Sequence, residues 1–209
     1  MRIKHYFSKD ENKRAEFIFN FIAPLYSKMN HSLGVNYTKI IKTLKKEIEI
    51  EGKKVLDIGS GTGVWSAVYK KHGAGEVLGI DFAKNMVSES NKNYPHLNFI
   101  QGDAENLHQL EDNTFDIVTA SYVIHGVTQK HRTRMLSEMK RVSRKHIVLH
   151  DFKGETPLFV KFLEFMERSD YKHFKQNICN ELKSISSKVE TVELENGSGL
   201  YIVDISGQQ

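Results

Sequence analysis

The sequence predicts a single α/β domain, a three-layer sandwich in which helices cover both faces of a seven-stranded, mostly parallel sheet. Its 209 residues correspond to roughly 1.4 domains of ordinary size, which favours one domain over two. From residue 53 onward, short apolar runs alternate with segments of helical apolar spacing, as in parallel sheets. Near the carboxyl end, Asn196-Gly197 lies between two strand-like runs, so we expect a hairpin and an antiparallel last strand.

The first 50 residues are expected to form a helical cap. Apolar residues recur there at helical spacing in two sets, Phe17, Ile18, Phe21 and Ile22, then Tyr37, Ile40, Ile41, Leu44 and Ile48. Pro24 and Gly34 lie between these sets, and we expect them to interrupt the helical structure.

The following elements are expected in chain order. The central part predicts strand 55–58, helix 64–72, strand 76–80, helix 83–93, strands 97–100 and 115–120, helix 130–142 and strand 146–150. The remainder predicts an apolar helix over 158–166 and strands over 189–194 and 200–205.

Composition excludes several classes of protein. The single cysteine, Cys179, excludes an intrachain disulfide and cysteine-based zinc clusters, and it fits a reducing cytoplasm. No window approaches the about 18 apolar residues of a membrane-spanning helix, and the first 14 residues lack the apolar run of a secretory signal. The formal net charge of +4 is a mild excess for nucleic-acid binding.

The most informative segment is VLDIGSGTG, residues 55–63, in which a predicted strand runs into three alternating glycines before a helix. Glycines allow left-handed backbone angles and close approach of a ligand, and amides at a helix start favour anions. The dinucleotide pattern G-x-G-x-x-G fails here, because Val64 or Ser66 occupies its third position. The phosphate-binding pattern ending in Gly-Lys-Ser/Thr is absent too.

Three acidic residues are expected at one edge of the sheet. Asp57, Asp81 and Asp103 lie at or just after the ends of three successive strands, and ligands of open α/β sheets bind outside these carboxyl ends. An acid in the position of Asp81 commonly binds the hydroxyls of an adenosine ribose. Each Asp could instead cap a helix or stabilise a turn.

As an ordered set, these segments resemble class I S-adenosylmethionine-dependent methyltransferases, of the type 11 and ubiquinone/menaquinone C-methyltransferase kind. VLDIGSGTG matches their first motif, GIDFAKNM (79–86) the second, and QGDAENL (101–107) and FDIVTASYVIH (115–125) the third and fourth. The resemblance spans 55 to about 151 and implies a Rossmann-like fold, S-adenosylmethionine as cofactor and methyl transfer. It also implies a division into a cap (1–50), a cofactor-binding core (51–151) and a substrate-side part (152–209).

The resemblance implies a role for each matching residue. At the methionine part of the cofactor it places Gly59, Ser60, Gly61 and Gly63, with Asp57 facing the loop or the ammonium group. At the adenosine part it places Asp81 on the ribose hydroxyls, Phe82 and Met86 near the adenine, and Asp103 on the adenine amino group beside Ala104. At the methyl-transfer site it places Ser121, Tyr122 and His125.

Residues 21–30, FIAPLYSKMN, are similar to the segment IAP-x-Y-D-x-M-N that opens the quinone C-methyltransferases, with Ser27 in place of the Asp. The resemblance implies that Tyr26 reaches the cofactor carboxylate. Alternatively, the segment is a surface helix whose aromatic residues pack on the sheet. The apolar segment 157–166 could roof an apolar substrate pocket or cover one face of the sheet.

Methyl transfer from a sulfonium is an in-line displacement that needs alignment and exclusion of water, and a base only where the acceptor must lose a proton. His125 is the first candidate for that base, with His150, Asp151 and His31 behind it, although a lone His is more often structural.

Several acceptor classes are disfavoured. The Asn/Asp-Pro-Pro-Tyr/Phe motif, a cysteine nucleophile in motif order, a paired-glutamate loop and clustered metal ligands are all missing from the sequence. We therefore expect a small-molecule acceptor, apolar or aromatic ones included, and no metal. The sequence leaves the oligomeric state open.

Two other functions stay open. One is a nicotinamide-dependent oxidoreductase, which is disfavoured because the third glycine of the dinucleotide-binding pattern is missing. The other is a methyltransferase-fold protein that binds RNA or a partner through the basic segment 130–145, which we otherwise expect to be a solvated helix face remote from the site.

Overall fold

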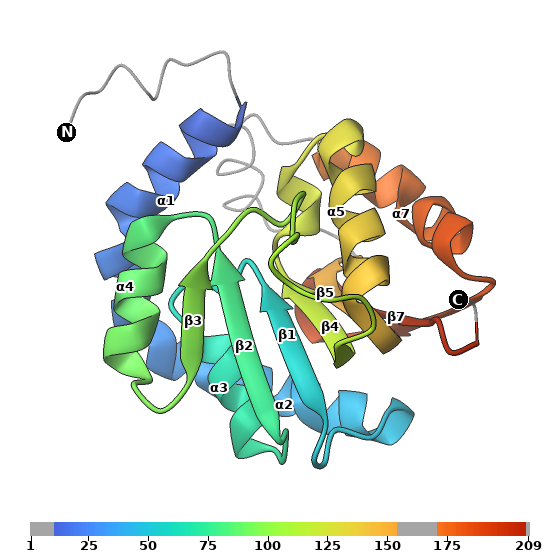
Figure 1. Cartoon of the computed structure of the whole chain (residues 1–209), viewed down its shortest axis with the longest axis horizontal. Coiled ribbons are helices and arrows are strands. Elements are labelled where there is room, and N and C mark those ends of the chain that lie inside the picture. The colour runs from blue at the N-terminus through green and yellow to red at the C-terminus, as the bar shows by residue number, and fades with distance from the viewer. Residues whose placement is uncertain (1–10, 154–170, 208–209) are drawn as a thin grey trace.

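The computed structural model describes residues 11–153 and 171–207. Its sheet has seven strands in the order β3-β2-β1-β4-β5-β7-β6, and β7 is antiparallel to both neighbours (Figure 1). The predicted fold class is confirmed. The strands are β1 (Lys54–Ile58), β2 (Glu76–Asp81), β3 (Asn98–Gln101), β4 (Phe115–Ser121), β5 (Ser143–Phe152), β6 (Lys188–Glu193) and β7 (Ser198–Asp204).

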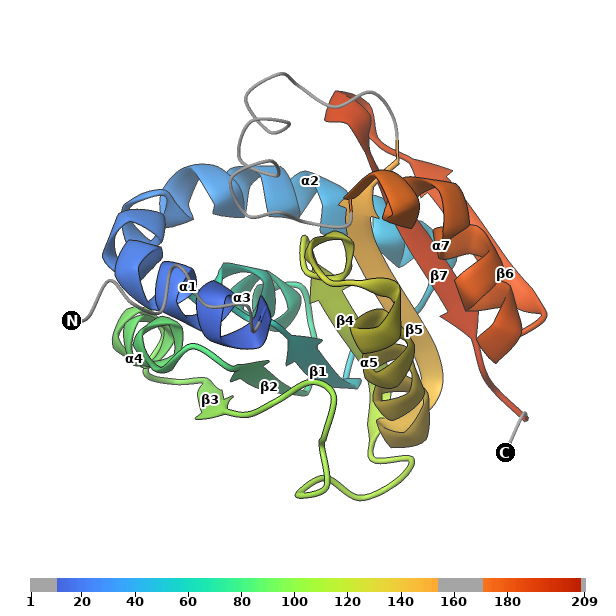
Figure 2. The same cartoon turned by 90° about the horizontal axis from the view of Figure 1, so that it is seen from above.

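Helices flank this sheet on both faces, as the view from above shows (Figure 2). They are α1 (Glu11–Lys28), α2 (Asn30–Glu47), α3 (Val64–Lys71), α4 (Lys84–Asn93), α5 (Gln129–Val142) and α7 (Tyr171–Ile185). Two short 3₁₀ helices, η2 (Ile124–Gly126) and η3 (Glu195–Gly197), follow β4 and β6. The hairpin expected at Asn196-Gly197 is therefore present, with η3 as its turn and Gly197 at φ +74°.

The alternation of side chains along each strand creates two cores. Val55, Ile117 and Val148 pack with α2 and α3 on one face of the sheet. Their sequence neighbours Leu56 and Val118 pack with α5 and α7 on the other face. Because the central strands are buried on both faces, they read in the sequence as continuous apolar runs.

The cap differs from the expected one at Pro24 and Gly34. Pro24 lies inside α1 and Gly34 inside α2, and the chain breaks between the helices at Met29 instead. A proline lacks the N–H that would bond to the carbonyl four residues earlier. Here that carbonyl, on Asn20, accepts from Asn85 Nδ2 of α4 at 2.8 Å, and Asn20 Oδ1 accepts from the Asn85 amide at 2.7 Å. The helix continues because a neighbour satisfies the freed carbonyl.

Helix α7 was not among the predicted elements. Its buried face consists of Phe174, Ile178 and Leu182, at a spacing of four residues, so a helical signal was present in the sequence. The apolar helix expected over 158–166 lies outside the described residues. Strand β5 extends beyond the expected 146–150 at both ends, because Ser143 pairs with Phe115 of β4 and the pairing with β7 continues to Phe152.

Candidate active site

The glycine loop follows β1 at the carboxyl edge of the sheet. Gly59, Gly61 and Gly63 have φ of +65°, +52° and +87°, a region that other residues rarely adopt. A Cβ on Gly59 would lie 2.5 Å from a methyl of Val123, so side-chain bulk is excluded there. A Cβ on Gly61 would have nothing within 4 Å, so the loop surface at Gly61 is open. A ligand can therefore approach the backbone at this point.

Asp57 is buried beneath the loop, with 1% of its surface exposed. Its Oδ2 accepts from Ser66 Oγ at 2.5 Å, whereas Oδ1 has no hydrogen-bond partner among the described residues. Burial, together with the nearby charge of Asp81, raises the pKa of the Asp57 carboxyl to about 7. The buried hydroxyl of Ser60 in the loop above also has no partner in that part of the chain. Buried polar groups of this kind bond to an ordered water or to a ligand, and the Asp57 carboxylate favours a cationic one.

Asp81 ends β2 and holds the glycine loop in place. Its Oδ2 accepts from the Gly61 amide at 2.9 Å and its Oδ1 from the Ala83 amide at 2.8 Å. Burial raises the pKa of this carboxyl to about 6. Each oxygen keeps a second lone pair, so the same carboxylate can accept from the hydroxyls of a ligand. The turn role weighed for Asp81 is thus present, and it does not compete with ligand binding.

Asp103 and Ala104 lie on the neighbouring segment, after β3. The pairing of Asp81 with Gln101 brings this segment beside the end of β2. Asp103 is exposed, and its Oδ1 accepts from the Glu105 amide at 2.9 Å, the geometry of a turn. Ala104 is half-buried against the core.

The cap reaches the glycine loop through a residue that the sequence analysis missed. Asn30, the first residue of α2, accepts with Oδ1 from Thr62 Oγ1 at 2.7 Å. Tyr26 lies near the end of α1 with 38% of its surface exposed. It is close enough to Tyr37 to contribute slightly to the raised pKa of that hydroxyl. Burial raises the pKa of Tyr37 well above its usual value.

Phe82 and Met86 lie where α1 covers α4. The ring of Phe82 meets that of Phe19 edge-on at 6.0 Å between centroids. Met86 is buried in a cluster with Ala23 of α1. Both residues therefore contact the cap.

On the other side of β1, the chain leaves β4 through a strained residue. Tyr122 has φ +55°, which is uncommon for a residue with a side chain, and its amide donates to the carbonyl of His150 at 2.8 Å. Its ring packs edge-on against His150, with 4.6 Å between centroids. Such strain persists where the surroundings enforce it, and it is common at functional sites.

His125 and Asp151 form a buried pair. His125 Nδ1 lies 2.7 Å from Asp151 Oδ1, and the amide of His125 donates to Asp151 Oδ2 at 3.3 Å. The rings of Tyr122, Phe152 and Tyr171 surround the imidazole, with centroids 6.3, 4.8 and 6.2 Å away. A histidine oriented by a carboxylate and enclosed by aromatic rings can exchange a proton with a flat acceptor.

A second polar chain lies behind Ser121. Ser121 Oγ is 3.1 Å from the Tyr37 hydroxyl and 2.8 Å from His150 Nδ1, and His150 Nε2 is 3.3 Å from Ser198 Oγ. Burial lowers the pKa of His150 to about 4, so its ring is neutral at pH 7. His150 therefore belongs to a structural network of hydrogen bonds. His31, the other histidine considered as a base, is exposed on α2.

The basic segment 130–145 forms the expected solvated face only in part. Arg132 is fully buried and binds Glu181 of α7 with both Nε (2.6 Å) and Nη2 (2.9 Å). Arg144 pairs with Asp116 at 2.5 Å. Lys130, Arg134 and Lys145 are exposed, as a solvated face requires, so the departure is at Arg132. Ion pairs to carboxylates elsewhere in the chain neutralise several of the arginines, which reduces the charge on which an RNA-binding interpretation rested.

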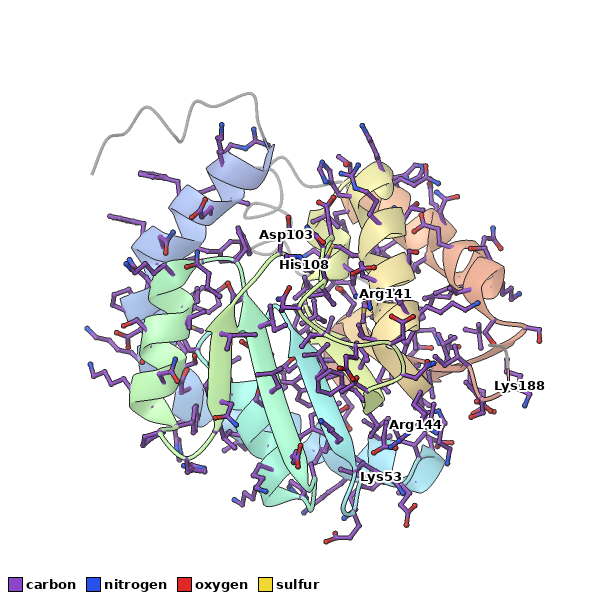
Figure 3. The ribbon with its side chains drawn as sticks, viewed as in Figure 1. Lys53, Asp103, His108, Arg141, Arg144 and Lys188 are labelled. Carbon is purple, nitrogen blue, oxygen red and sulfur yellow. The ribbon has the colours of Figure 1, made fainter. Side chains whose placement is uncertain are left out.

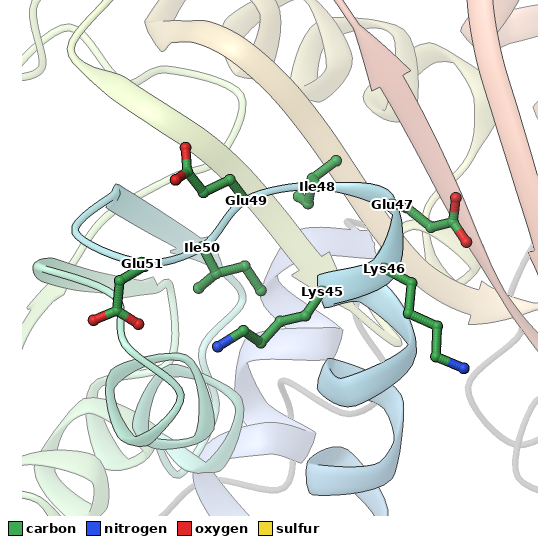
Figure 4. Close-up of a pocket in the computed structure, with 7 residues that line it drawn as sticks. All are labelled: Lys45, Lys46, Glu47, Ile48, Glu49, Ile50 and Glu51. Carbon is green, nitrogen blue, oxygen red and sulfur yellow. The ribbon is translucent and has the colours of Figure 1, made fainter.

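Other features lie away from this edge. A pocket of about 340 Å³ is lined by residues 45–51, before β1 begins, and so lies at the opposite edge of the sheet (Figure 4). The part of the chain that the structure describes has no cluster of three or more His, Cys, Asp or Glu able to hold a metal. Within the same residues, no helix is long and apolar enough to cross a membrane.

Comparisons with known proteins identify the family and the fold. Residues 55–146 match a family described as a methyltransferase domain. Demethylmenaquinone methyltransferase from Staphylococcus saprophyticus is 30% identical over 163 residues, 73% of this chain and 68% of the relative. The enzyme of that name from Staphylococcus carnosus is 33% identical over 142 residues, 65% of this chain and 58% of the relative.

Among solved structures, magnesium protoporphyrin IX methyltransferase from Synechocystis PCC 6803 with bound S-adenosylmethionine superposes with a TM-score of 0.68. At 17% identity it shares the fold, over 95% of this chain and 98% of that one. The chain spans about half to two thirds of the length of the first curated relatives it matches. By motif order, relatives and fold, the chain belongs to the class I S-adenosylmethionine-dependent methyltransferases.

Proposed function

We propose that this protein transfers a methyl group from S-adenosylmethionine to a small molecule. One observation carries the proposal: a glycine loop with an open face lies between two buried carboxylates, Asp57 and Asp81, at the carboxyl edge of the sheet. Membership of the methyltransferase family supports it, as do the names of the relatives.

The residues present fit this cofactor. The unsatisfied Oδ1 of Asp57 suits a cationic ammonium group, and Asp81 keeps lone pairs for the ribose hydroxyls. When bound, the cofactor supplies a methyl group on a sulfonium, which leaves behind a neutral thioether. The other residues that we assign to cofactor binding are Tyr26, Gly59, Ser60, Gly61, Gly63, Phe82, Met86, Asp103, Ala104, Ser121 and Tyr122.

We assign to His125 the removal of a proton from the acceptor. Asp151 accepts from Nδ1 and thereby selects the tautomer in which Nε2 is the basic nitrogen. The buried carboxylate also stabilises the imidazolium that forms when Nε2 takes a proton. The aromatic rings around the imidazole keep water away from it.

The acceptor class that these walls favour is an aromatic ring that carries an acidic proton, such as a quinol or a phenol. The ring of Tyr122, which is 38% exposed, lies beside His125 and offers a surface for an aromatic acceptor, with Phe152 packed behind it. Two relatives are named demethylmenaquinone methyltransferases, which supports the same class. We also propose that the protein acts in the cytoplasm, and that its chain divides into a cap, a cofactor-binding core and a substrate-side part.

Calorimetric titration with S-adenosylmethionine and S-adenosylhomocysteine tests cofactor binding. We expect wild type to bind both, and Asp81→Asn to bind at least about tenfold more weakly, because about 1.4 kcal/mol of hydrogen bonding to a charged group is lost. Glu76→Gln, at the other end of β2, is the matched control and should bind as wild type does. Absence of binding to wild type at millimolar ligand contradicts the proposal.

Transfer is tested with methyl-labelled cofactor against quinols, phenols and thiols. Label in a quinol or phenol that depends on His125 supports the assigned acceptor class. If label appears only in a thiol, the proposal of methyl transfer stands and the quinol or phenol acceptor class is refuted.

A further inference from the structure

The segment between β3 and β4, residues 102–114, contains neither helix nor strand. Its internal hydrogen bonds are all between residues close in sequence: Asp103 and Asn106 form an isolated bridge, the Leu110 amide donates to the Leu107 carbonyl at 2.8 Å, and Thr114 Oγ1 donates to the Glu111 carbonyl at 2.8 Å. Its second residue is Asp103, which we assign to the adenine. Such local bonds shape single turns, so the position of the whole segment on the domain depends on its neighbours.

Helix α5 supplies a first attachment close to Asp103. The carboxylate of Glu105 binds Arg134 Nε at 2.5 Å through one oxygen and His131 Nδ1 through the other. Arg134 Nη2 also lies 2.9 Å from His131 Nδ1. Glu105 is two residues from Asp103, and its amide donates to the Asp103 carboxylate. This attachment therefore fixes the turn in which Asp103 lies.

A second attachment holds the middle of the segment. The Leu107 amide donates to Glu138 Oε2 at 2.7 Å. Arg141 donates to the carbonyls of Leu107 and Leu110 and to Asp112 Oδ1, at 2.9, 2.9 and 2.6 Å. Glu138 and Arg141 also pair with each other at 2.8 Å (Arg141 and Asp103 are labelled in Figure 3). The planar fork of arginine suits such simultaneous bonds, which lysine cannot reproduce.

We propose that Arg134, Glu138 and Arg141 of α5 are positioning residues for the adenine end of the cofactor. They hold residues 102–114 in the one shape that presents the Asp103 carboxylate beside the end of β2. The inference rests on the proposed function, and it gives part of the basic segment a purpose that a solvated face would not have. Without these bonds the segment samples other shapes. The apparent affinity for the cofactor then falls in proportion to the fraction of molecules that keep the binding-competent shape.

Calorimetry with S-adenosylhomocysteine tests the inference in Arg141→Gln, Glu138→Gln and Arg134→Gln. If about a tenth of the molecules keep the competent shape, the Kd rises about tenfold. Arg144→Gln is the matched control, because its ion pair with Asp116 lies outside the segment. Arg134 is partly exposed, so its variant should fold even where Arg141→Gln does not.

Double variants separate positioning from general destabilisation. If Arg141 acts through Asp103, adding Arg141→Gln to Asp103→Ala should weaken binding little further, because the group being positioned is already gone. Additive losses, or an unchanged Kd in folded single variants, overturn the inference while leaving the proposed function intact. Absence of binding to wild type overturns both.

Discussion

Replacing Asp57 with Asn is expected to stabilise the ligand-free protein at pH 8. Asp57 is buried, one of its oxygens has no partner in the described chain, and its pKa is raised to about 7. The folded protein therefore has to hold a charge in a place that disfavours it. An amide has nearly the same shape and carries no charge, and Ser66 Oγ can serve it as a hydrogen-bond partner.

The expected size follows from the difference in pKa. An exposed Asp titrates near 3.8, so between that value and about 7 the folded state of this site binds more protons than the unfolded state. Stability from Asp57 is then complete below pH 3.8 and is lost as the pH rises through about 7. About three pKa units at about 1.4 kcal/mol each give an upper bound of about 4 kcal/mol.

Thermal and denaturant unfolding of wild type and Asp57→Asn at several pH values from 4 to 8 measures this difference. Carboxylates with lowered pKa values, such as Asp116 and Glu138, titrate in both proteins and cancel when one curve is subtracted from the other. The gain in the Asn variant should grow steadily toward pH 8. In the same variant, S-adenosylhomocysteine should raise Tm less than it does in wild type, because the ammonium has lost its anion.

A difference between the two proteins that stays constant from pH 4 to pH 8 would refute the reasoning. So would a variant that is less stable at pH 8 although its secondary structure is intact. The first result would mean that the pKa of Asp57 is not raised in the folded protein, and the second that the folded protein stabilises the Asp57 anion.

The remaining predictions concern the acceptor side, the buried ion pair and the loop. His125→Gln should lower kcat about 100- to 10,000-fold while the Kd for S-adenosylmethionine stays unchanged; an unaltered kcat would remove His125 from the chemistry. Arg132→Ala should cost about 3–5 kcal/mol in urea unfolding, because Glu181 is left without its partner, and a double change to apolar residues should recover most of the loss. Gly59→Ala should destabilise by about 2 kcal/mol or more, through its positive φ and the clash with Val123; a wild-type urea midpoint would contradict this.

Much of the fold was predictable because its signals are local. Residues 55–58 and 115–120 carry buried apolar side chains on both faces, as parallel strands covered on both sides do. The meeting of Asp57 and Asp81 also followed from sequence, because the carboxyl ends of neighbouring parallel strands share one edge. The error at Pro24 has the opposite origin, since the bond that permits it comes from Asn85 in another helix.

The parts of the site that escaped prediction depend on contacts between distant residues. His125 and Asp151 were both candidates, but their pairing requires β4 and β5 to be adjacent and in register. The carboxylate that neutralises Arg132 comes from α7, a helix that was not predicted. Formal charge counted along one segment therefore overestimated the free charge on its surface.

The amide bridge between Asn20 and Asn85 has a consequence for how the cap folds. Helix α1 has a gap in its own hydrogen bonding at Pro24, and a side chain from α4 closes that gap. Alone, α1 would lack this bond in the middle of its length, so its helical state and its docking are one cooperative event. In native-state hydrogen exchange, the amides on either side of Pro24 should open together, and Asn85→Ala should speed their exchange more than that of amides in β1.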